Sequence, residues 1–598
     1  MADNKDRLIG RPIHEGLPRR AWTTIAAVFL GALGLASILW WFAPMWAVND
    51  ADHTRITAAG QEVPDREKIA EAEGAARTPL GVAGAALLAG AAAVAGAIVS
   101  SHNARLTRES LEQTRESNRL AALRDSDTKE HSSRVLTHEQ ARADDDRFTK
   151  AIDQLGNTSA SVRLGALHSL HRLATQRTER TEVVLDVFCA YLRQPFHHPD
   201  HDHEPSEPPS TEDPTGDAWW PHDHKERDER AAEGEVRRTA LRLIRELLPP
   251  ALPSDQRPDS ALNDVIPLTP GKQRFNLNLS GAALDHLDLR ERQVGVLALE
   301  GAYVAGRVVL TQAQVDGALL LGEGTHIRKD LVIGLGARVL QVYMGQGTRV
   351  DGTLRISGGS RIERGVDLGP DCYVGAIEIA GAAEVDRLDL GAGVRVAGNI
   401  TIKDEAQVQR VLRVGRGTRI GGKIGLSHGR LHGNLSVEQD VHIAQGIEIG
   451  WDSLVHGAVQ IGQDSHLLAL DVDAGAIIDG GIILDGAHIE NMITLDDGAQ
   501  VHRGVRLYRR AIVGGHLALR SGARITGMVY LNTSVLRGLT LDEGAHLELL
   551  RVDEQGRLEL LDVASPTQIG RVEMHRESDT PIDLLTAKGL DVDLWPET

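Results

Sequence analysis

Large aliphatic residues recur at a fixed interval in the stretch NLSGAALDHLDLRERQVGVLALEGAYVAGRVV, which covers residues 278–309. The interval is five residues, and the positions are Leu279, Leu284, Leu289, Val294, Leu299, Val304 and Val309. Neither an α-helix nor a plain strand has this period, since their side chains repeat about every 3.6 and every 2 residues. A coil of short strands with one aliphatic side chain per side has it, so this spacing constrains the fold strongly.

A longer unit becomes visible beyond Val309. The segments LDLGAGVRVAGN, LRVGRGTRIGGK and LDVDAGAIIDGG each contain two aliphatics one residue apart, then a Gly or small residue, then another aliphatic. The unit has 11 or 12 residues and recurs from about Phe275 to Asp562. An aliphatic pair places both side chains on one face of a short strand, and Gly and Asp supply turns with positive φ. Stacked units therefore predict a parallel β-solenoid with a continuous apolar interior.

Two such units per coil predict four short sides and about 23 residues per coil. Residues 449–468, IGWDSLVHGAVQIGQDSHLL, permit a different local count, because Ile449, Val455, Ile461 and Leu467 fall every six residues. That count resembles the hexapeptide repeat of left-handed β-helix acyltransferases and predicts triangular coils of roughly 18 residues. A polymer-forming bactofilin, which also has short triangular coils, is a further alternative at the level of the fold.

The composition agrees with a repeat protein, because Gly is abundant at 62 residues and aromatic residues make up only 3% of the chain. The formal net charge of −19 argues against general binding of polyanions, so a nucleic-acid partner is disfavoured. The two cysteines, Cys189 and Cys372, are isolated and lack zinc-site spacing, which predicts two buried thiols in a reducing compartment.

Two uncharged segments near the N-terminus are long enough to cross a bilayer. They lie between Arg20 and Asp50 and between Arg77 and His102, and a membrane helix takes about 20 residues. The second segment carries small residues at a spacing of four, namely Gly81, Ala85 and Ala89, which predicts close approach of the two helices.

Basic residues flank this predicted hairpin on the sides of both termini. They are Lys5, Arg7, Arg11, Arg19 and Arg20 before it, and Arg105, Arg108, Arg115, Arg119 and Arg124 after it. The positive-inside rule then predicts a multi-pass protein of the inner (plasma) membrane, with both termini and the solenoid in the cytoplasm.

Helical periodicity follows the second apolar segment. The runs RFTKAIDQLGNTSASVRLGALHSLHRLA and EVVLDVFCAYLR, within residues 147–193, resemble a segment of bacterial membrane-anchored pentapeptide-repeat proteins. In that family the segment lies between a pair of membrane helices and the repeat domain. The resemblance implies a quadrilateral β-helix downstream, without assigned catalytic activity in most members. The later repeats depart from the family because they lack regular A-[DN]-L-x-x pentads.

Residues 195–235 are rich in Pro, Asp, Glu and His, which predicts a disordered linker. Its histidines and acids offer ligands for a transition metal, but we expect a solvated segment and no specific metal or cofactor. The residues concerned are His197, His198, Asp200, His201, Asp202, His203, His222, Asp223 and His224. Trp219 and Trp220 are candidates for docking on a neighbouring surface.

The sequence contains no phosphate-binding loop, nucleophile elbow or zinc-protease motif. His456 is the one candidate general base inside a six-residue register, and we expect it to be an outward side chain. Two groups of charged residues are candidate contact surfaces, and for both we expect a solvated exterior. They are an acidic group of Asp471, Asp473, Asp479, Asp485, Asp496 and Asp497, and a basic band of Arg410, Arg413, Arg416, Arg419 and Lys423.

The sequence thus predicts an all-β solenoid preceded by an α-helical segment and two transmembrane helices. Its expected parts are a tail (1–20), a first span (21–49), an extracytoplasmic loop (50–77), a second span (78–101), a polar stalk (102–146), a small α-domain (147–194), the linker (195–235), a fourth helix (236–250), the β-helix (275–562) and a C-terminal cap (563–598). We expect no enzyme but a membrane-anchored scaffold that binds a protein partner or itself. The alternatives are a DNA-mimic inhibitor, a hexapeptide-type acyltransferase and a bactofilin-like filament.

Overall fold

The computed structural model describes residues 19–47, 54–56, 62–64, 66–196, 198, 222–252 and 274–595. The chain divides into two compact units, Met1–Arg142 and Ala143–Thr598. Most of the predicted N-terminal tail, most of the His-rich linker and its Trp219–Trp220 pair lie outside the described residues, whereas Arg19 and Arg20 already belong to the first helix.

The described residues of the first unit form two helices and a small hairpin. Helix α1 (Arg19–Ala47) is followed by the antiparallel strands β1 (Thr54–Ile56) and β2 (Glu62–Pro64), and then by α2 (Arg66–Leu155). Among the described helices, two segments are apolar and long enough to cross a membrane, Arg19–Phe42 of α1 and Gly81–Ser101 of α2. Helix α2 begins well before the second apolar segment and continues through the polar residues 102–146 without a break.

The packing of α1 against α2 corrects the predicted small-residue contact. A Cβ atom on Gly81 would lie 3.4 Å from the Trp40 ring, and one on Gly84 would lie 3.7 Å from the Cβ of Ala36. Ala85 and Ala89 are exposed instead. A strict spacing of four winds away from a straight contact line, because the helix repeats about every 3.6 residues. The prediction holds for Gly81 and is wrong for the other two residues.

Three further helices in the second unit pack with the end of α2 around buried aliphatic side chains. They are α3 (Ala160–Gln176), α4 (Thr181–Leu192) and α5 (His222–Leu247). Leu167, Leu170, Phe188 and Ile244 are fully buried among them. Helix α5 begins inside the stretch predicted as linker, where Lys, Glu, Arg and Ala favour a helix.

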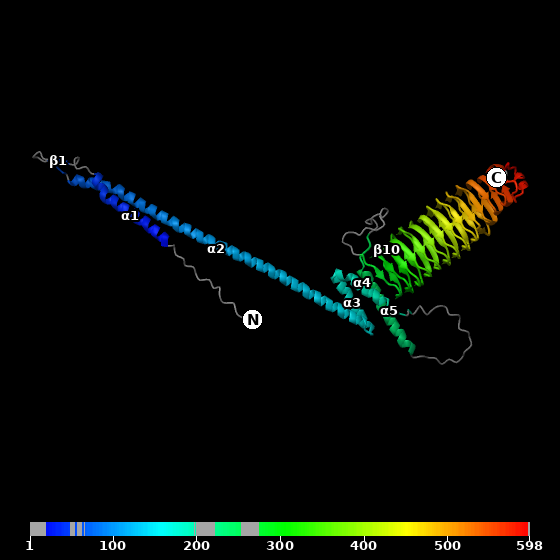
Figure 1. The fold of residues 1–598 in the computed structure, drawn as a ribbon, viewed down its shortest axis with the longest axis horizontal. Coiled ribbons are helices and arrows are strands. Elements are labelled where there is room, and N and C mark those ends of the chain that lie inside the picture. The colour runs from blue at the N-terminus through cyan, green and yellow to red at the C-terminus, as the bar shows by residue number, and fades with distance from the viewer. Residues whose placement is uncertain are drawn as a thin grey trace. The chain divides into compact units, whose positions relative to one another are not determined.

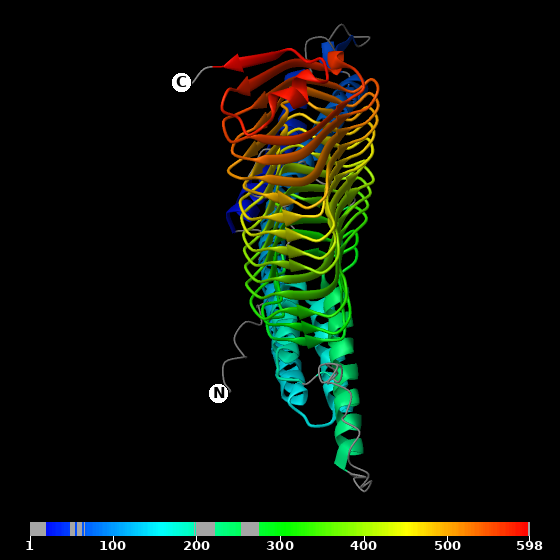
Figure 2. The same ribbon diagram turned by 90° about the vertical axis from the view of Figure 1, so that its right-hand side faces the viewer.

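A parallel β-solenoid of about 14 turns follows, which confirms the predicted fold class. Its strands run from β3 (Leu277–Asn278) to β44 (Val592–Trp595) in two sheets, and successive coils stack along one axis (Figures 1 and 2). The pairs Leu277↔Leu297, Leu297↔Leu319 and Val342↔Val366 each join one coil to the next. Their residue numbers show that the coils lengthen slightly after the first.

Each coil has four short sides. In the second coil these are β6 (Gln293–Val294) and β7 (Leu297–Ala298) of one sheet, then β8 (Tyr303–Val304) and β9 (Val308–Val309) of the other. The local six-residue count fails, since Val455 pairs with Ile478 and Val459 with Ile482, which lie further along the chain than a triangular coil reaches. The triangular coils of that alternative are therefore absent from this part of the solenoid.

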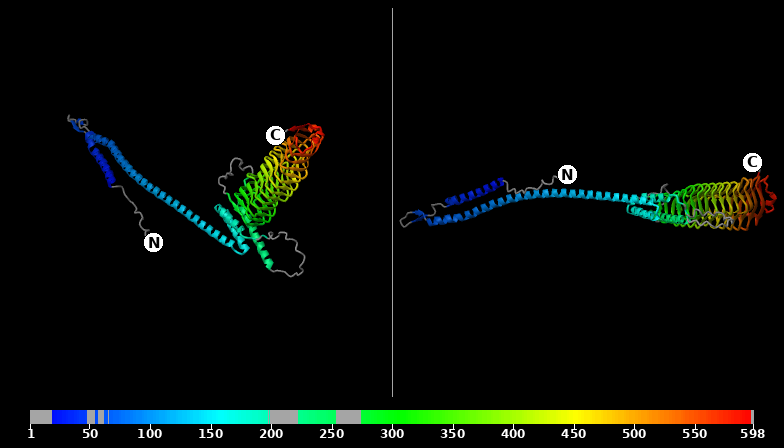
Figure 3. Two further views of the ribbon diagram at one scale, coloured as in Figure 1. Left: turned by 45° about the vertical axis from the view of Figure 1, so that its right-hand side comes forward. Right: turned by 90° about the horizontal axis from the view of Figure 1, so that it is seen from below.

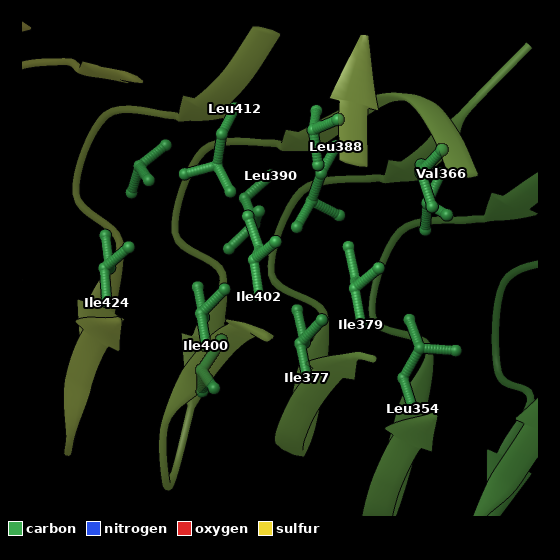
Figure 4. Packing of buried hydrophobic residues seen from close by; sticks show 14 of the residues in the cluster. Leu354, Val366, Ile377, Ile379, Leu388, Leu390, Ile400, Ile402, Leu412 and Ile424 are labelled. Carbon is green, nitrogen blue, oxygen red and sulfur yellow. The ribbon is translucent and has the colours of Figure 1, made fainter. Parts of the chain in front are cut away.

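Aliphatic side chains form continuous columns inside the solenoid. Leu354, Ile377, Ile400 and Ile424 occupy equivalent positions on four successive coils, and all are fully buried. Figure 4 shows this column facing a second one that contains Val366, Leu388 and Leu412. Each side chain thus packs on its copies above and below as well as across the core, which is how units too small to fold alone become stable.

Small polar residues and glycines form the corners. Thr325, Thr348, Thr418 and Ser465 are buried and donate hydrogen bonds to main-chain carbonyls, several of them on the preceding coil. Another set of corner residues, Asp371, Asp440, Asp452 and Asp464, adopts positive φ, as do many of the glycines. This agrees with the turn role expected for Gly and Asp.

The N-terminal end of the solenoid is covered by helices. Pro250, just after α5, forms a bridge with Arg292 at the start of the second coil, and Ala251 donates its amide to the Glu291 carbonyl at 2.8 Å. These contacts satisfy backbone groups that a bare solenoid end would leave open.

At the other end the stack continues beyond the expected limit of Asp562. Strands β43 (Ile569–His575) and β44 extend one sheet, while the short helix α6 (Ile582–Thr586) lies against β42 (Arg557–Val563) of the other. The two views in Figure 3 show this regular stacking up to the C-terminal coils. The segment expected as a separate cap is thus largely an additional coil.

Candidate interaction surface

Ion pairs between neighbouring coils neutralise most of the predicted basic band. Arg410 pairs with Asp386 at 2.9 Å, Arg416 with Asp440 at 3.2 Å, and Lys423 with Glu448. Arg413 also has two carboxylate partners on adjacent coils, Asp389 and Glu438. Only the Arg419 side chain makes no hydrogen bond or ion pair with any described residue, so the band as a whole is a mixed-charge surface.

The predicted acidic group is split between the two sheets. Asp471, in β31 (Leu470–Val472), lies with Asp473 and Asp496 on one sheet, whereas Asp485, in β33 (Ile482–Asp485), belongs to the other. Asp479 is paired with His456 and His502, and Asp485 forms an ion pair with Arg509 at 3.1 Å. The described residues therefore do not form one continuous acidic row.

One acidic cluster is nevertheless electrostatically unfavourable. The pKa of Asp473 is raised to about 6, first by burial and then by the neighbouring carboxylates of Glu448, Asp496 and Asp471. Burial also raises the pKa of Asp471. These groups repel one another across adjacent coils, and Lys423 is the cation that partly offsets the repulsion.

His456 is an outward side chain in a small histidine–carboxylate cluster. Its Nδ1 lies 2.8 Å from Asp479, whose other oxygen lies 2.9 Å from Nδ1 of His502. The ring of His432 stacks on that of His456 at a centroid distance of 5.2 Å. The side chains of His456, Asp479 and His502 are all substantially exposed. His456 therefore lacks the enclosed setting of a general base.

Of the predicted metal-ligand candidates, only His198 has a described side chain. It is buried, shares a hydrogen bond of 2.5 Å with Asp285, and packs against the ring of Tyr303. Within the described ranges no group of three His, Cys, Asp or Glu side chains is placed to hold a metal ion. His222 and Asp223 begin helix α5, and the remaining linker ligands lie outside the described residues or have no described side chain.

Both cysteines are free and buried. Burial raises the pKa of Cys189 to about 12 and that of Cys372 to about 11. Thiols with such pKa values are poor nucleophiles at neutral pH, so both behave as core residues.

A column of cationic and aromatic side chains crosses nine successive coils. Its members occupy the first residue of equivalent strands and are Tyr303, His326, Arg349, Tyr373, Arg395, Arg419, His442, His466 and His488. We call this set the arginine–aromatic column. Its members contact one another: the Arg349 guanidinium lies 4.7 Å from the centre of the Tyr373 ring, and the His466 and His488 rings stack at 5.3 Å.

The middle of the column differs from the part that precedes it. Arg349 is paired with Asp351 at 2.6 Å, and the same carboxylate bonds to His326. Arg395 and Arg419 are adjacent in register and exposed, and neither side chain makes a hydrogen bond or ion pair with another described residue. Two like charges on neighbouring strands destabilise each other unless an anion joins them.

The sequence analysis did not identify the arginine–aromatic column, although its members recur at a regular spacing along the sequence. Its members recur once per coil, whereas the repeat recognised in the sequence is only half a coil long. An alignment of the sequence by whole coils, instead of by half-coil units, places these residues in one column.

The chain was compared with protein families, curated proteins and solved structures. No protein-family profile, curated protein or solved structure matches the chain.

Proposed function

We propose that this protein is a non-catalytic, membrane-anchored scaffold whose solenoid presents rigid outer faces to a protein partner. The observation that carries the proposal is the uninterrupted stack of about 14 turns, whose in-register strands repeat each outward position on coil after coil. Such a surface is suited to recognition of extended partners, as in other solenoid proteins. The fold is consistent with the expected pentapeptide-repeat relationship, which stays part of the proposal.

The anchor in this proposal consists of the apolar segments of α1 and α2. The basic residues before the first segment and after the second favour cytoplasmic termini, so the solenoid is proposed to lie on the cytoplasmic side of the inner membrane. Labelling of single cysteines with a membrane-impermeant maleimide tests this orientation. In intact cells a cysteine at Thr54 should react and one at Ser126 should not, and the opposite pattern would refute it.

Two observations support a binding role over the alternatives of DNA mimicry and acyl transfer. The acids divide between two sheets, although a DNA mimic needs a continuous acidic face. His456 is engaged by Asp479 on an exposed surface instead of lining a groove.

Site-specific photo-cross-linking in cells tests the scaffold proposal. A photoreactive residue is placed in full-length protein at outward positions on both sheets, Thr401 and Gln460, and at the buried control position Ile377. Discrete adducts from an outward position are expected, with none from the control. The absence of adducts from every outward position, together with a monomeric protein in detergent, would contradict the proposal.

A further inference from the structure

Arg395 and Arg419 form an isolated pair of unneutralised cations in the middle of the arginine–aromatic column. They are directly paired in register, between β19 (Arg395–Val396) and β22 (Arg419–Ile420). Tyr373 precedes them and His442 follows them on the adjoining coils. Many other arginines of the solenoid have a carboxylate partner one coil away, for example Arg355 with Glu378 and Arg361 with Glu384.

The surface beside this pair is lined by residues without long side chains. The residues two positions after these four members of the column have no side chain beyond Cβ. They are Gly375, Ala397, Gly421 and Ala444. Gly375 and Gly421 are required there, because a Cβ on either would lie 2.3 Å from a carbonyl oxygen of the preceding coil. A main chain can therefore lie on this shelf with its side chains directed at the guanidinium groups.

We propose that the Arg395–Arg419 pair is the docking site for an extended acidic segment of a partner protein, with carboxylates at alternate positions. The inference rests on the proposed scaffold function and names the kind of partner. Adjacent strands are about 4.8 Å apart, and alternate side chains of an extended peptide are about 6.6 Å apart. Long arginine side chains bridge that difference, and each guanidinium can hold one carboxylate in a bidentate pair.

The size of the cationic patch favours a peptide over a nucleic acid. From Tyr373 to His442 the patch spans three strand spacings, about 14 Å, which an extended peptide of about four residues covers. Asp351 neutralises the column on one side, and Glu490 follows the strand of His488 on the other. A long polyphosphate chain would meet these carboxylates and the overall charge of −19.

The test uses full-length protein in nanodiscs of neutral phosphatidylcholine and fluorescence anisotropy. The probe is a fluorescein-labelled Ser-Glu-Ser-Glu-Ser-Glu-Ser peptide, and the matched probe has Gln in place of Glu. Arg395→Gln/Arg419→Gln should weaken binding of the acidic probe about fivefold to tenfold, because two charge-assisted pairs are lost. Arg395→Lys/Arg419→Lys should recover part of it, and the Gln probe should not bind.

The control variant is Arg430→Gln/Arg524→Gln. It removes the same charge from exposed strand-starting arginines of the other sheet, which also make no ion pair with described residues. Equal weakening by both double variants, or no binding of the acidic probe to the unaltered protein, would overturn the proposal. So would tighter Arg395- and Arg419-dependent binding of oligothymidylate or of phosphatidylserine nanodiscs.

Failure here and failure of the scaffold function give different results. If the unaltered protein does not bind the acidic probe, while cross-linked adducts persist in cells with Arg395→Gln/Arg419→Gln, this docking site is refuted and the scaffold function stands. Absence of adducts from all outward positions, together with a monomeric protein in detergent, would refute the scaffold itself.

Discussion

A Cβ atom on Gly433 would lie 1.2 Å from the carbonyl oxygen of Arg410 on the preceding coil. Gly433 forms the corner between β24 (Arg430–Leu431) and β25 (Asn434–Val437), and its φ is not positive. The glycine is therefore required by the close approach of two coils and not by turn conformation.

Gly433→Ala should destabilise the solenoid by about 2 kcal/mol or more, because the coils must separate to admit the methyl group. Denaturant unfolding followed by circular dichroism measures this loss. Gly425→Ala is the control, since its Cβ would contact only the Lys423 side chain at 3.6 Å. Equal effects of the two substitutions would show that backbone entropy, and not the contact with Arg410, governs the position.

Asp473→Asn should stabilise the protein at pH 7.5 and have little effect near pH 4. The folded pKa of Asp473 is raised to about 6 from its ordinary 3.8, so the folded state binds the proton more tightly than the unfolded state. The contribution of this group to stability is thus full at low pH and is lost as the pH rises through about 6. Because the carboxyl is partly exposed, solvent screening limits the gain to about 1 kcal/mol.

Unfolding midpoints at pH 4 and pH 7.5 measure that difference. Asp497→Asn removes an exposed carboxylate close to the cluster and is the control. A gain from Asp473→Asn that is the same at both pH values would argue against titration of Asp473 as its cause.

Both thiols should resist maleimide at pH 7.5 in folded protein and react when it unfolds, because burial raises the pKa of each. Cys372→Thr should change stability by less than about 1 kcal/mol. The Cys372 thiol donates to the Gly345 carbonyl at 3.0 Å, and the Thr348 hydroxyl donates to Gly322 in the equivalent place one coil earlier. Cys372→Leu, which lacks a donor and is larger, should destabilise by about 2 kcal/mol. Rapid labelling of native Cys372 would contradict its burial.

Arg237→Met should loosen the helical cover of the first coil. The buried Arg237 guanidinium donates to the carbonyls of Leu192 at 2.8 Å and Gln194 at 2.6 Å, and it pairs with Glu233. We expect a loss of about 3 kcal/mol, because two carbonyls lose a buried donor and Glu233 loses one of its partners while it keeps Arg163 and Tyr191. Hydrogen exchange should increase in the first coils and not near β39 (Arg524–Leu531). Arg242→Met, at an exposed i,i+4 pair with Glu246, should have an effect below about 0.5 kcal/mol.

The solenoid was predictable because the regular spacing of aliphatic residues along the sequence determines which side chains form its core. Leu284, Leu289 and Val294 each close one side of a coil, and all are buried as the spacing requires. The local count around Val455 misled because adjacent sides of a four-sided coil also place one aliphatic about every six residues. Only the pairing between strands distinguishes the two.

Outer-surface features were harder to predict because they depend on which residues become neighbours across coils. Arg416 and Asp440 lie on different coils and far apart in the sequence, yet their side chains pair at 3.2 Å. The basic band therefore looks uniform in the sequence although all but Arg419 of its members are neutralised. The start of α5 at His222 was missed for another reason. The histidines and acidic residues of this stretch predicted disorder, although the backbone from His222 onward is helical.

Coils of the solenoid contact mainly the coils directly above and below, as the pairing of Val455 with Leu431 and Ile478 illustrates. Duplication of one coil would therefore shift every later coil by a single strand spacing of about 4.8 Å and leave its contacts unchanged. The number of coils therefore sets the distance between the helices at the N-terminal end of the solenoid and a partner bound at its C-terminal end. Insertion or deletion of one coil changes this distance by one discrete step.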